Sequence, residues 1–252
     1  MSNKAKRHAI LAVQVTLALL AVAGAAWLGL KAFGYARAQG VYHDLQAAYA
    51  SELGDPDKEA TSSACPVDFA SLQGQYSDVV GWLKMDDVDV SYPIVKGTDN
   101  DHYLHYDAAG KESVAGAIFI DSRNESIEGD KHVLVYGHNM MDESMFGQLD
   151  NYLDESFYWN GDGMFTIYTP QGSYRYRIFS VAVVDPTDET YTTGYKNELV
   201  FDSFVKHLVG QSMYETGINV TGADHVVSLS TCSASDRLVL CAQRVSAQPW
   251  EA

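Results

Sequence analysis

Cys232 is the residue in this chain with the strongest signs of a chemical role. It follows the apolar run His225–Thr231 and precedes Ser233–Asp236 (SASD), a short stretch of turn-forming residues. The next segment, Arg237–Val245, is again rich in valine and leucine, so the two segments are expected to pair as a β-hairpin. That pairing sets Cys232 opposite Arg237, with Cβ atoms about 5 Å apart. A thiol beside a permanent cation is favoured as thiolate, which is the nucleophilic form.

The other two of the three cysteines fit no catalytic role. Cys241 lies inside the second strand and pairs with Ser228 in the same register, roughly 13 Å from Cys232, which is too far for a disulfide. It is interpreted as a small buried hydrophobe. Cys65 lies in a polar, linker-like segment and has no evident partner. The sequence contains no CxxC pair and no Cys/His cluster with zinc spacing, so no metal site is predicted.

A cysteine nucleophile needs a group that accepts and returns a proton, and this group is usually histidine. Among the eight histidines, His138 is distinguished by its position, because it directly follows a buried strand and Gly137 in LVYGHNMMDESMF. Loops at strand ends are where a rigid scaffold presents reactive groups. The pattern favours an ordinary loop role for His102 and His105, but alone it does not decide among the histidines.

The elements that must position these residues are mostly strands. Many short strands with few helices predict a mainly β fold, a closed or nearly closed antiparallel barrel that leaves no exposed edges. The eight predicted strands are Val79–Lys84, Val88–Val95, Val114–Asp121, His132–Tyr136, Gly163–Thr169, Tyr174–Asp185, His225–Thr231 and Arg237–Val245.

Two helices and one tight turn interrupt the predicted strands. Pro170–Ser173 (PQGS) forms a hairpin turn. Asp142 caps a short helix whose apolar face carries Met145, Phe146, Leu149, Tyr152 and Leu153. A longer helix at Asn197–Tyr214 has Phe201, Phe204, Val205, Leu208 and Val209 at helical spacing. This second apolar face is expected to pack on the sheet, with a partner-binding helix as the alternative.

The N-terminal part predicts a membrane anchor. Ala9–Leu30 is an uncharged run, and as a helix it spans about 33 Å, enough for a bilayer core. A cleaved signal peptide is the alternative, because Ala23–Ala25 resembles a small-residue cleavage site. Basic residues ahead of the run place the N-terminus in the cytoplasm and the rest outside the cell. The expected division is a cytoplasmic tail at 1–8, an anchor at 9–30, a juxtamembrane helix and linker at 31–67, and the β domain at 68–252.

Composition excludes one class of partner. The chain has 252 residues, 46% of them hydrophobic and 20% charged, as in an ordinary folded protein. The net charge of −16 argues against nucleic acid, whose binding depends on Lys and Arg at phosphates. An acidic balance of this kind usually serves solubility and identifies no partner.

Three short motifs, in this order, resemble the active-site signatures of the sortases. They are YGHNM at Tyr136–Met140, LSTC at Leu229–Cys232, and the arginine that opens the next strand. The surrounding sequence is similar to the class B type in VVGWLKMDDVDVSYPIVKGTDNDHYL, GKESVAGAIFIDSRN and HVLVYGHNMMDESMFGQLDNY, and in the helical insertion between the sixth and seventh strands. The resemblance covers Phe69–Val245, and the ordered set is specific although each motif is short.

The resemblance implies a sortase-type eight-stranded β-barrel and a membrane-anchored cysteine transpeptidase of Gram-positive bacteria. Such enzymes cleave a C-terminal sorting motif of surface proteins, of the Asn-Pro-x-Thr type for class B. They then join the threonine carbonyl to an amine, usually of peptidoglycan. The resemblance implies no metal and no organic cofactor.

The motif match also implies roles for individual residues. Cys232 is the nucleophile, His138 the general acid and base, and Arg237 the cation that stabilises the oxyanion or binds substrate. Ser230 and Thr231 line the substrate groove.

One feature departs from the class pattern. The loop from Cys232 to Arg237 is shorter than is usual in this class, which leaves Arg244 as a competitor for the cationic role. Arg244 faces the opposite side of the strand in the expected pairing, which favours Arg237.

Three other functions stay open at this stage. A secreted cysteine peptidase with the same pair of residues would release free acids and would not depend on an amine. A pilin-polymerising sortase would use a protein amine as acceptor. A non-catalytic surface-binding domain would keep its activity after Cys232→Ala.

Overall fold

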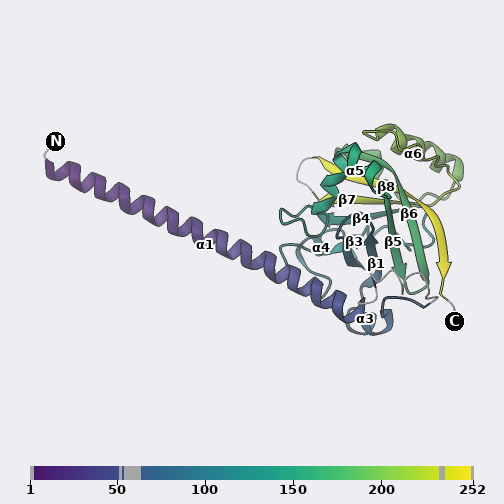
Figure 1. The fold of residues 1–252 in the computed structure, drawn as a ribbon, viewed down its shortest axis with the longest axis horizontal. Helices are drawn as coiled ribbons and strands as arrows, with labels where there is room; N and C mark the ends of the chain where they lie inside the picture. Colours follow the sequence, from purple (N-terminus) through teal and green to yellow (C-terminus); the bar gives the residue numbers. More distant parts are fainter. Residues whose placement is uncertain (1–2, 51–52, 54–63, 233–235, 251–252) are drawn as a thin grey trace.

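The computed structural model describes residues 3–50, 53, 64–232 and 236–250. Eight strands close into a barrel in the order β1-β2-β3-β4-β7-β8-β6-β5, and one long helix, α1, projects from it (Figure 1). The strands are β1 (Val79–Met85), β2 (Ser91–Lys96), β3 (Ile118–Ile120), β4 (His132–His138), β5 (Met164–Thr169), β6 (Gly172–Val184), β7 (Val226–Cys232) and β8 (Arg237–Pro249). The helices are α1 (Asn3–Tyr49), α3 (Phe69–Gln75), α4 (His102–His105), η1 (Gly147–Leu153), α5 (Glu155–Asn160), η2 (Glu189–Tyr191) and α6 (Glu198–Gln211).

All eight predicted strands are present and the predicted closure is confirmed. Expecting an antiparallel barrel throughout was wrong, because β2–β3 and β4–β7 pair in parallel. Parallel neighbours cannot be joined by a hairpin. The connection from β2 to β3 carries α4, and the chain between β4 and β7 passes through β5, β6 and α6. The hairpin turn predicted at Pro170–Ser173 is present but shorter, since β6 already begins at Gly172, which forms the last pair of the β5–β6 hairpin with Thr169.

The prediction that a helix starts at Asp142 was wrong. The Asp142 carboxylate accepts from the Ser144 amide in a local turn, and the following 3₁₀ helix η1 begins only at Gly147. Between them Glu143 and Met145 have φ values of 64° and 54°, which a regular helix cannot accommodate. Of the predicted apolar face, Leu153 is 40% exposed, and the buried members are Met145, Phe146, Leu149 and Tyr152.

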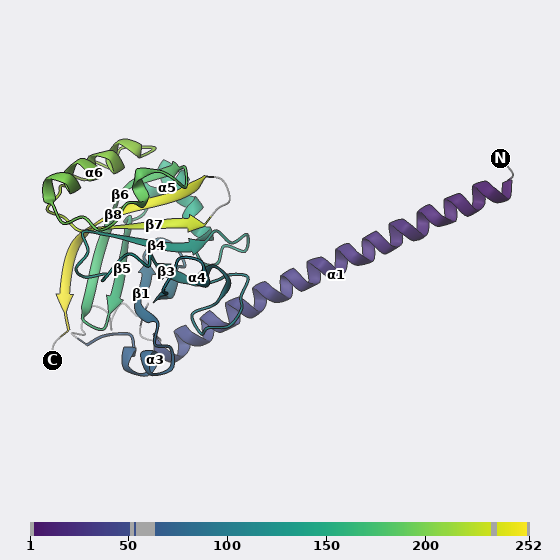
Figure 2. The ribbon, with the colours of Figure 1, turned by 180° about the vertical axis from the view of Figure 1, so that it is seen from behind.

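The second predicted helix is confirmed as α6. Its N-cap is Asn197, whose side chain accepts from the amides of Leu199 and Val200. Four of its five predicted apolar residues are buried and Val209 is 44% exposed. The buried side of α6 packs with residues of β6, β7 and β8 in a core cluster of its own, and Figure 2 shows the helix lying over the outside of the barrel.

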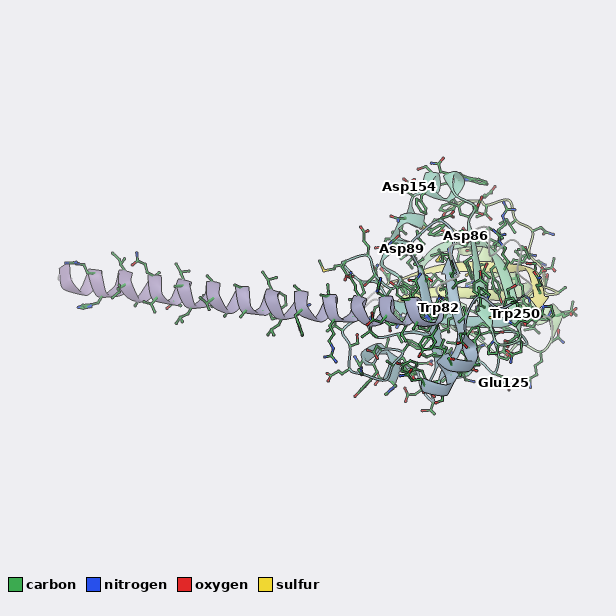
Figure 3. All side chains as sticks on the ribbon, turned by 60° about the horizontal axis from the view of Figure 1, so that its bottom comes forward. Trp82, Asp86, Asp89, Glu125, Asp154 and Trp250 are labelled. Atoms are coloured by element: carbon green, nitrogen blue, oxygen red, sulfur yellow. The ribbon has the colours of Figure 1, made fainter. Side chains whose placement is uncertain are left out.

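α1 is a single helix through the expected anchor and the expected juxtamembrane helix. It is the one described helix that is long and apolar enough to cross a membrane. Its large apolar side chains from Ile10 to Phe33 are exposed, and Figure 3 shows them spread around the part that projects from the barrel. From Ala38 onward, Ala38, Tyr42 and Leu45 are buried at helical spacing against the barrel. Most of the predicted linker, residues 54–63, lies outside the described residues.

One buried imidazole joins β4, β7 and the segment before α6. Nδ1 of His132 lies 2.8 Å from the Thr192 carbonyl oxygen, and Nε2 lies 2.8 Å from Ser228 Oγ. A carbonyl can only accept, so Nδ1 donates and the neutral ring accepts the serine hydroxyl at Nε2. Burial lowers the pKa of His132 to about 4, although the hydrogen bond to Thr192 opposes the shift.

This pKa makes folding stability dependent on pH. Below about pH 6.5 His132 is protonated in the unfolded chain, but in the native state it stays neutral down to about pH 4. The free energy of unfolding therefore decreases as the pH falls from about 6.5 to about 4. We expect His132→Gln to be less stable than wild type at neutral pH, with the gap narrowing by about 2 to 3 kcal/mol as the pH falls to about 4.5. Urea unfolding of both proteins across this range measures it, and a gap independent of pH would contradict the assignment.

Candidate functional site

The parallel pairing of β4 and β7 brings two of the predicted site residues together. The last pair of this ladder is His138 with Cys232. Neighbouring strands lie about 4.8 Å apart, and paired residues in a parallel ladder project to the same face of the sheet. Only the backbone of Cys232 is described, and the ladder sets it beside the backbone of His138. We call this end of the barrel, where β4 and β7 finish and β8 begins, the site end.

The imidazole of His138 is held in one orientation. Nε2 lies 2.8 Å from the carbonyl oxygen of Leu104, which can only accept, so Nε2 carries the proton in the neutral ring. Nδ1 is then the nitrogen with a lone pair for proton transfer. Gly116 lies against the ring, with φ of +56°, and a Cβ there would come within 3.1 Å of His138 Cδ2. Glycine therefore allows this backbone to approach the imidazole.

Arg237 opens β8 at the same end. The β7–β8 ladder runs from Val226–Gln243 to Ser230–Val239, and two further steps in this register bring Cys232 opposite Arg237. At the intervening step the Thr231 hydroxyl accepts from the Leu238 amide at 3.1 Å. The predicted pairing of Cys241 with Ser228 is confirmed. Residues 233–235 of the predicted turn lie outside the described residues.

The guanidinium of Arg237 rests on an aromatic ring. Its Cζ lies 5.5 Å from the centre of the Tyr191 ring, and within the described chain its buried Nε has no hydrogen-bond partner. The Tyr191 hydroxyl lies 3.0 Å from Ser230 Oγ, two residue pairs before the last pair of the β4–β7 ladder. A cation held by a π face keeps its donors available for another group.

An ion pair between the buried Asp121 and the 54% exposed side chain of Arg123 supports Tyr191 in turn. Arg123 Nη2 donates to the Tyr191 carbonyl at 3.0 Å and to the Asp121 carboxylate at 2.7 Å. Asp121 is fully buried and also accepts from the Tyr136 hydroxyl at 2.9 Å. Burial alone would raise the pKa of Asp121, but the hydrogen bonds from Arg123 and Tyr136 outweigh it and lower the pKa. The carboxylate stays ionised, so the network persists at neutral pH.

The two residues predicted to line the substrate groove, Ser230 and Thr231, are buried and hydrogen-bonded within the fold. Ser230 is 0% and Thr231 1% exposed. The Ser230 hydroxyl is shared with Tyr191, and the Thr231 hydroxyl bonds to the backbone of Leu238. Thr231 thus links β7 to β8 and Ser230 links β7 to Tyr191, and the role of both residues toward substrate stays a prediction.

The competing residues lie elsewhere. Arg244 is seven positions along β8 from Arg237, roughly 23 Å away. It donates to the Glu128 carbonyl at 2.9 Å and covers the ring of Tyr174. Cys241 is 2% exposed, and burial raises its pKa to about 12, so it stays protonated.

The neighbouring histidines have other roles. His102 stacks on Tyr106, with ring centres 4.3 Å apart. His105 belongs with His102 to the short helix α4.

Several supporting residues were not predicted. Tyr191 and the carbonyl of Leu104 come from connecting segments, where no periodic pattern points to a partner. Asp121 and Arg123 stand in the quoted segment GKESVAGAIFIDSRN, and a carboxylate two residues before an arginine after a buried strand is a usable signal for a local ion pair. Among the described residues no group of three His, Cys, Asp or Glu side chains is placed to hold a metal ion.

Taken together, the residue types at the site end are compatible with acyl transfer through a covalent intermediate. A thiol, an imidazole with one nitrogen available, and a guanidinium with available donors are the parts this chemistry needs. The described contacts use backbone and aromatic groups to hold the last two.

Comparison with known proteins agrees with this arrangement. A family model described as the sortase domain matches residues 83–245. The curated sortase B of Listeria monocytogenes is 31% identical over 207 residues, which is 81% of this chain and 82% of that protein. The sortase B of Staphylococcus aureus is 31% identical over 164 residues, 65% of this chain and 67% of that protein.

Solved structures agree as well. Sortase B from Bacillus anthracis in complex with AAEK1 superposes with a TM-score of 0.74 at 32% identity, covering 85% of this chain and 99% of that one. The Staphylococcus aureus sortase B–substrate complex gives 0.75 at 26% identity, with coverage of 85% and 99%. From its barrel, its matched domain and these relatives, the chain belongs to the sortase family and is a class B sortase, a cysteine transpeptidase.

Proposed function

We propose that Cys232 is the nucleophile of this sortase, His138 its general acid and base, and Arg237 its oxyanion-stabilising or substrate-binding cation. The observation that carries the proposal is the final β4–β7 pair, which sets His138 beside Cys232 on one face of the sheet. Arg237 follows from the β7–β8 register at the same end.

The first half-reaction forms a thioester. The Cys232 thiolate attacks the carbonyl carbon of the threonine in the sorting motif, and the carbonyl π electrons move to its oxygen. On collapse the carbon–nitrogen bond breaks, and protonated His138 gives its proton to the departing amide nitrogen. The protonation states of thiol and imidazole are coupled, since the productive form is thiolate with imidazolium.

Arg237 stabilises the charge that develops on the oxygen. A charge-assisted donor placed at the position of the oxyanion lowers the barrier more than it strengthens ground-state binding. The π face of Tyr191 suits this task, because it holds the guanidinium and leaves its N–H groups for the substrate.

The second half-reaction transfers the acyl group. An amine attacks the thioester, neutral His138 takes its proton, and the thiolate leaves. The Leu104 carbonyl at Nε2 leaves Nδ1 as the nitrogen that carries this proton in both halves.

The membrane anchor suits surface-protein substrates. The apolar helix α1 fits a single-pass anchor, and basic residues near its start favour a cytoplasmic N-terminus with the barrel outside. In Figures 1 and 2 the carboxyl end of β7 points to the side of the barrel from which α1 projects. We therefore propose that the enzyme acts on surface proteins with a C-terminal motif of the Asn-Pro-x-Thr type and transfers them to an amine of peptidoglycan.

Replacing the proposed nucleophile or base should abolish the reaction. Cys232→Ala and His138→Ala are expected to lose cleavage of a fluorescent Asn-Pro-x-Thr peptide. The first variant cannot form the thioester, and the second cannot transfer the proton. Cys241→Ser is the matched control and should keep most of the activity, since Cys241 is buried and remote. Peptide cleavage with and without an added amine measures both outcomes, and normal turnover by Cys232→Ala would remove the assignment.

Substitutions of the two arginines of β8 are expected to differ in their effect on kcat. Arg237→Gln is expected to lower kcat by roughly 10²- to 10³-fold, as for loss of one oxyanion donor. Arg244→Gln, at the other end of the strand, is expected to leave kcat within about 2-fold of wild type, since its contacts are with Glu128 and Tyr174. Steady-state kinetics with the same peptide decides it, and a reversed order would transfer the cationic role to Arg244.

The amine dependence distinguishes a transpeptidase from a peptidase. A transpeptidase gives an amide product in rising yield as the amine concentration increases. A hydrolase with the same residues gives only free acid, so mass spectrometry of the products separates the two.

A further inference from the structure

The helix that anchors the protein also contacts both backbone segments that surround His138. Tyr42 lies on α1, about twelve residues beyond the expected membrane run, and is 5% exposed. Its hydroxyl donates to the Gly116 carbonyl and accepts from the Ala108 amide at 3.3 Å. Its ring packs edge-on against Tyr92 of β2, with centres 5.2 Å apart.

The first route from Tyr42 reaches the imidazole through Gly116. A Cβ on Gly116 would lie 2.9 Å from the Leu104 carbonyl oxygen and 3.1 Å from His138 Cδ2, so this residue touches both the ring and its hydrogen-bond acceptor. The Ala117 amide donates to the Tyr103 carbonyl at 2.9 Å, which joins the two backbone segments. The Tyr42 hydroxyl thus fixes the backbone that holds His138 Nε2.

The second route runs through the loop after His138. The Tyr92 hydroxyl accepts from the Met145 amide at 3.0 Å, and Met145 has a φ of 54°. Met145 bridges to Asn139, and the Phe146 amide donates to the His138 carbonyl at 2.9 Å. Another residue of α1, Gln39, donates to Asp142 of this loop at 3.1 Å. The side of α1 that faces the barrel therefore also supports the loop that follows His138.

We infer that Tyr42 is a positioning residue for His138, so that the juxtamembrane part of α1 forms part of the catalytic apparatus as well as the anchor. The inference rests on the proposed role of His138. Tyr42 touches no reacting atom and acts by fixing the carbonyl that orients the imidazole. Small displacements of a catalytic group cost much in rate, because the reacting atoms must be held within a narrow range.

Tyr42→Phe tests this with a single oxygen removed. The ring still packs on Tyr92, but the Gly116 carbonyl and the Ala108 amide lose their partner. We expect kcat for the sorting peptide to fall roughly 10-fold or more with KM changed less than about 2-fold, because binding precedes the step that needs the imidazole. The ¹H–¹³C signals of the His138 ring should shift as well, which reports on position without reference to turnover.

Tyr49→Phe is the matched control on the same helix. The Tyr49 hydroxyl donates to Gln75 of α3 at 2.6 Å and has no link to His138. It should leave kcat and the His138 signals as in wild type. If Tyr42→Phe folds poorly, Tyr92→Phe serves instead, because it removes the Met145 contact from the barrel side without changing α1. It should likewise lower kcat and shift the His138 ring signals.

The outcomes separate this inference from the proposed function. Unchanged His138 signals and unchanged kcat in folded Tyr42→Phe would overturn it, as would equal losses in Tyr42→Phe and Tyr49→Phe. If His138→Ala keeps full activity, the catalytic role of His138 fails, while a shift of its ring signals in Tyr42→Phe would still show the contact. All variants are compared in the full chain, with melting temperatures recorded alongside.

Discussion

The parallel pairing of β4 with β7 is the constraint on which the site depends. A parallel ladder sets residues of equal depth side by side on one face, so the carboxyl ends of both strands place His138 and Cys232 together. Parallel strands require a crossover, and between β4 and β7 the chain runs through β5, β6 and then the segment with η2 and α6. The same segment contributes Tyr191, on which Arg237 rests. One topological choice thus brings three distant parts of the chain to a single end of the barrel.

Around that pairing, the polar groups divide into two kinds. Arg123 and Tyr136 both donate to the buried carboxylate of Asp121, and the half-exposed Arg123 also donates to the Tyr191 carbonyl, so each of these groups has a partner. Arg237 is different, since its Nε is buried without a partner among the described residues. A buried donor left unsatisfied is costly, and such groups concentrate where substrate supplies the missing acceptor.

Much of this could be predicted from the sequence. All eight strands, the β7–β8 register and the buried state of Cys241 follow from period-two patterns and a short turn, which are local signals. The parallel pairs could not be predicted in this way, because pairing between distant strands leaves no local mark. The segment after Asp142 misled for a related reason: Met145, Phe146 and Leu149 are spaced as in a helix, but positive φ at Glu143 and Met145 delays the helix to Gly147.

The supporting residues of the site were the hardest to predict. Leu104 acts through its carbonyl and Gly116 through the absence of a side chain, so the residue types do not predict these contacts. The motif resemblance named the side chains that we propose to be reactive, and the structure adds the contacts that hold His138 and Arg237. The expected anchor and the expected juxtamembrane helix form the single helix α1, and its continuity places Tyr42 against the Gly116 backbone.

The central claim is tested most directly by a crosslink between the ends of β4 and β7. His138→Cys, with Cys65→Ser and Cys241→Ala to remove other thiols, should form a disulfide with Cys232 under mild oxidation, because Cα atoms of paired residues lie about 4.8 Å apart, within disulfide reach. Intact mass spectrometry should show the loss of two hydrogens and no titratable thiol. Asn139→Cys in the same background should stay reduced, since successive residues face opposite sides of a strand. Two free thiols in the His138→Cys protein after oxidation, or a bridge formed only from position 139, would contradict the account.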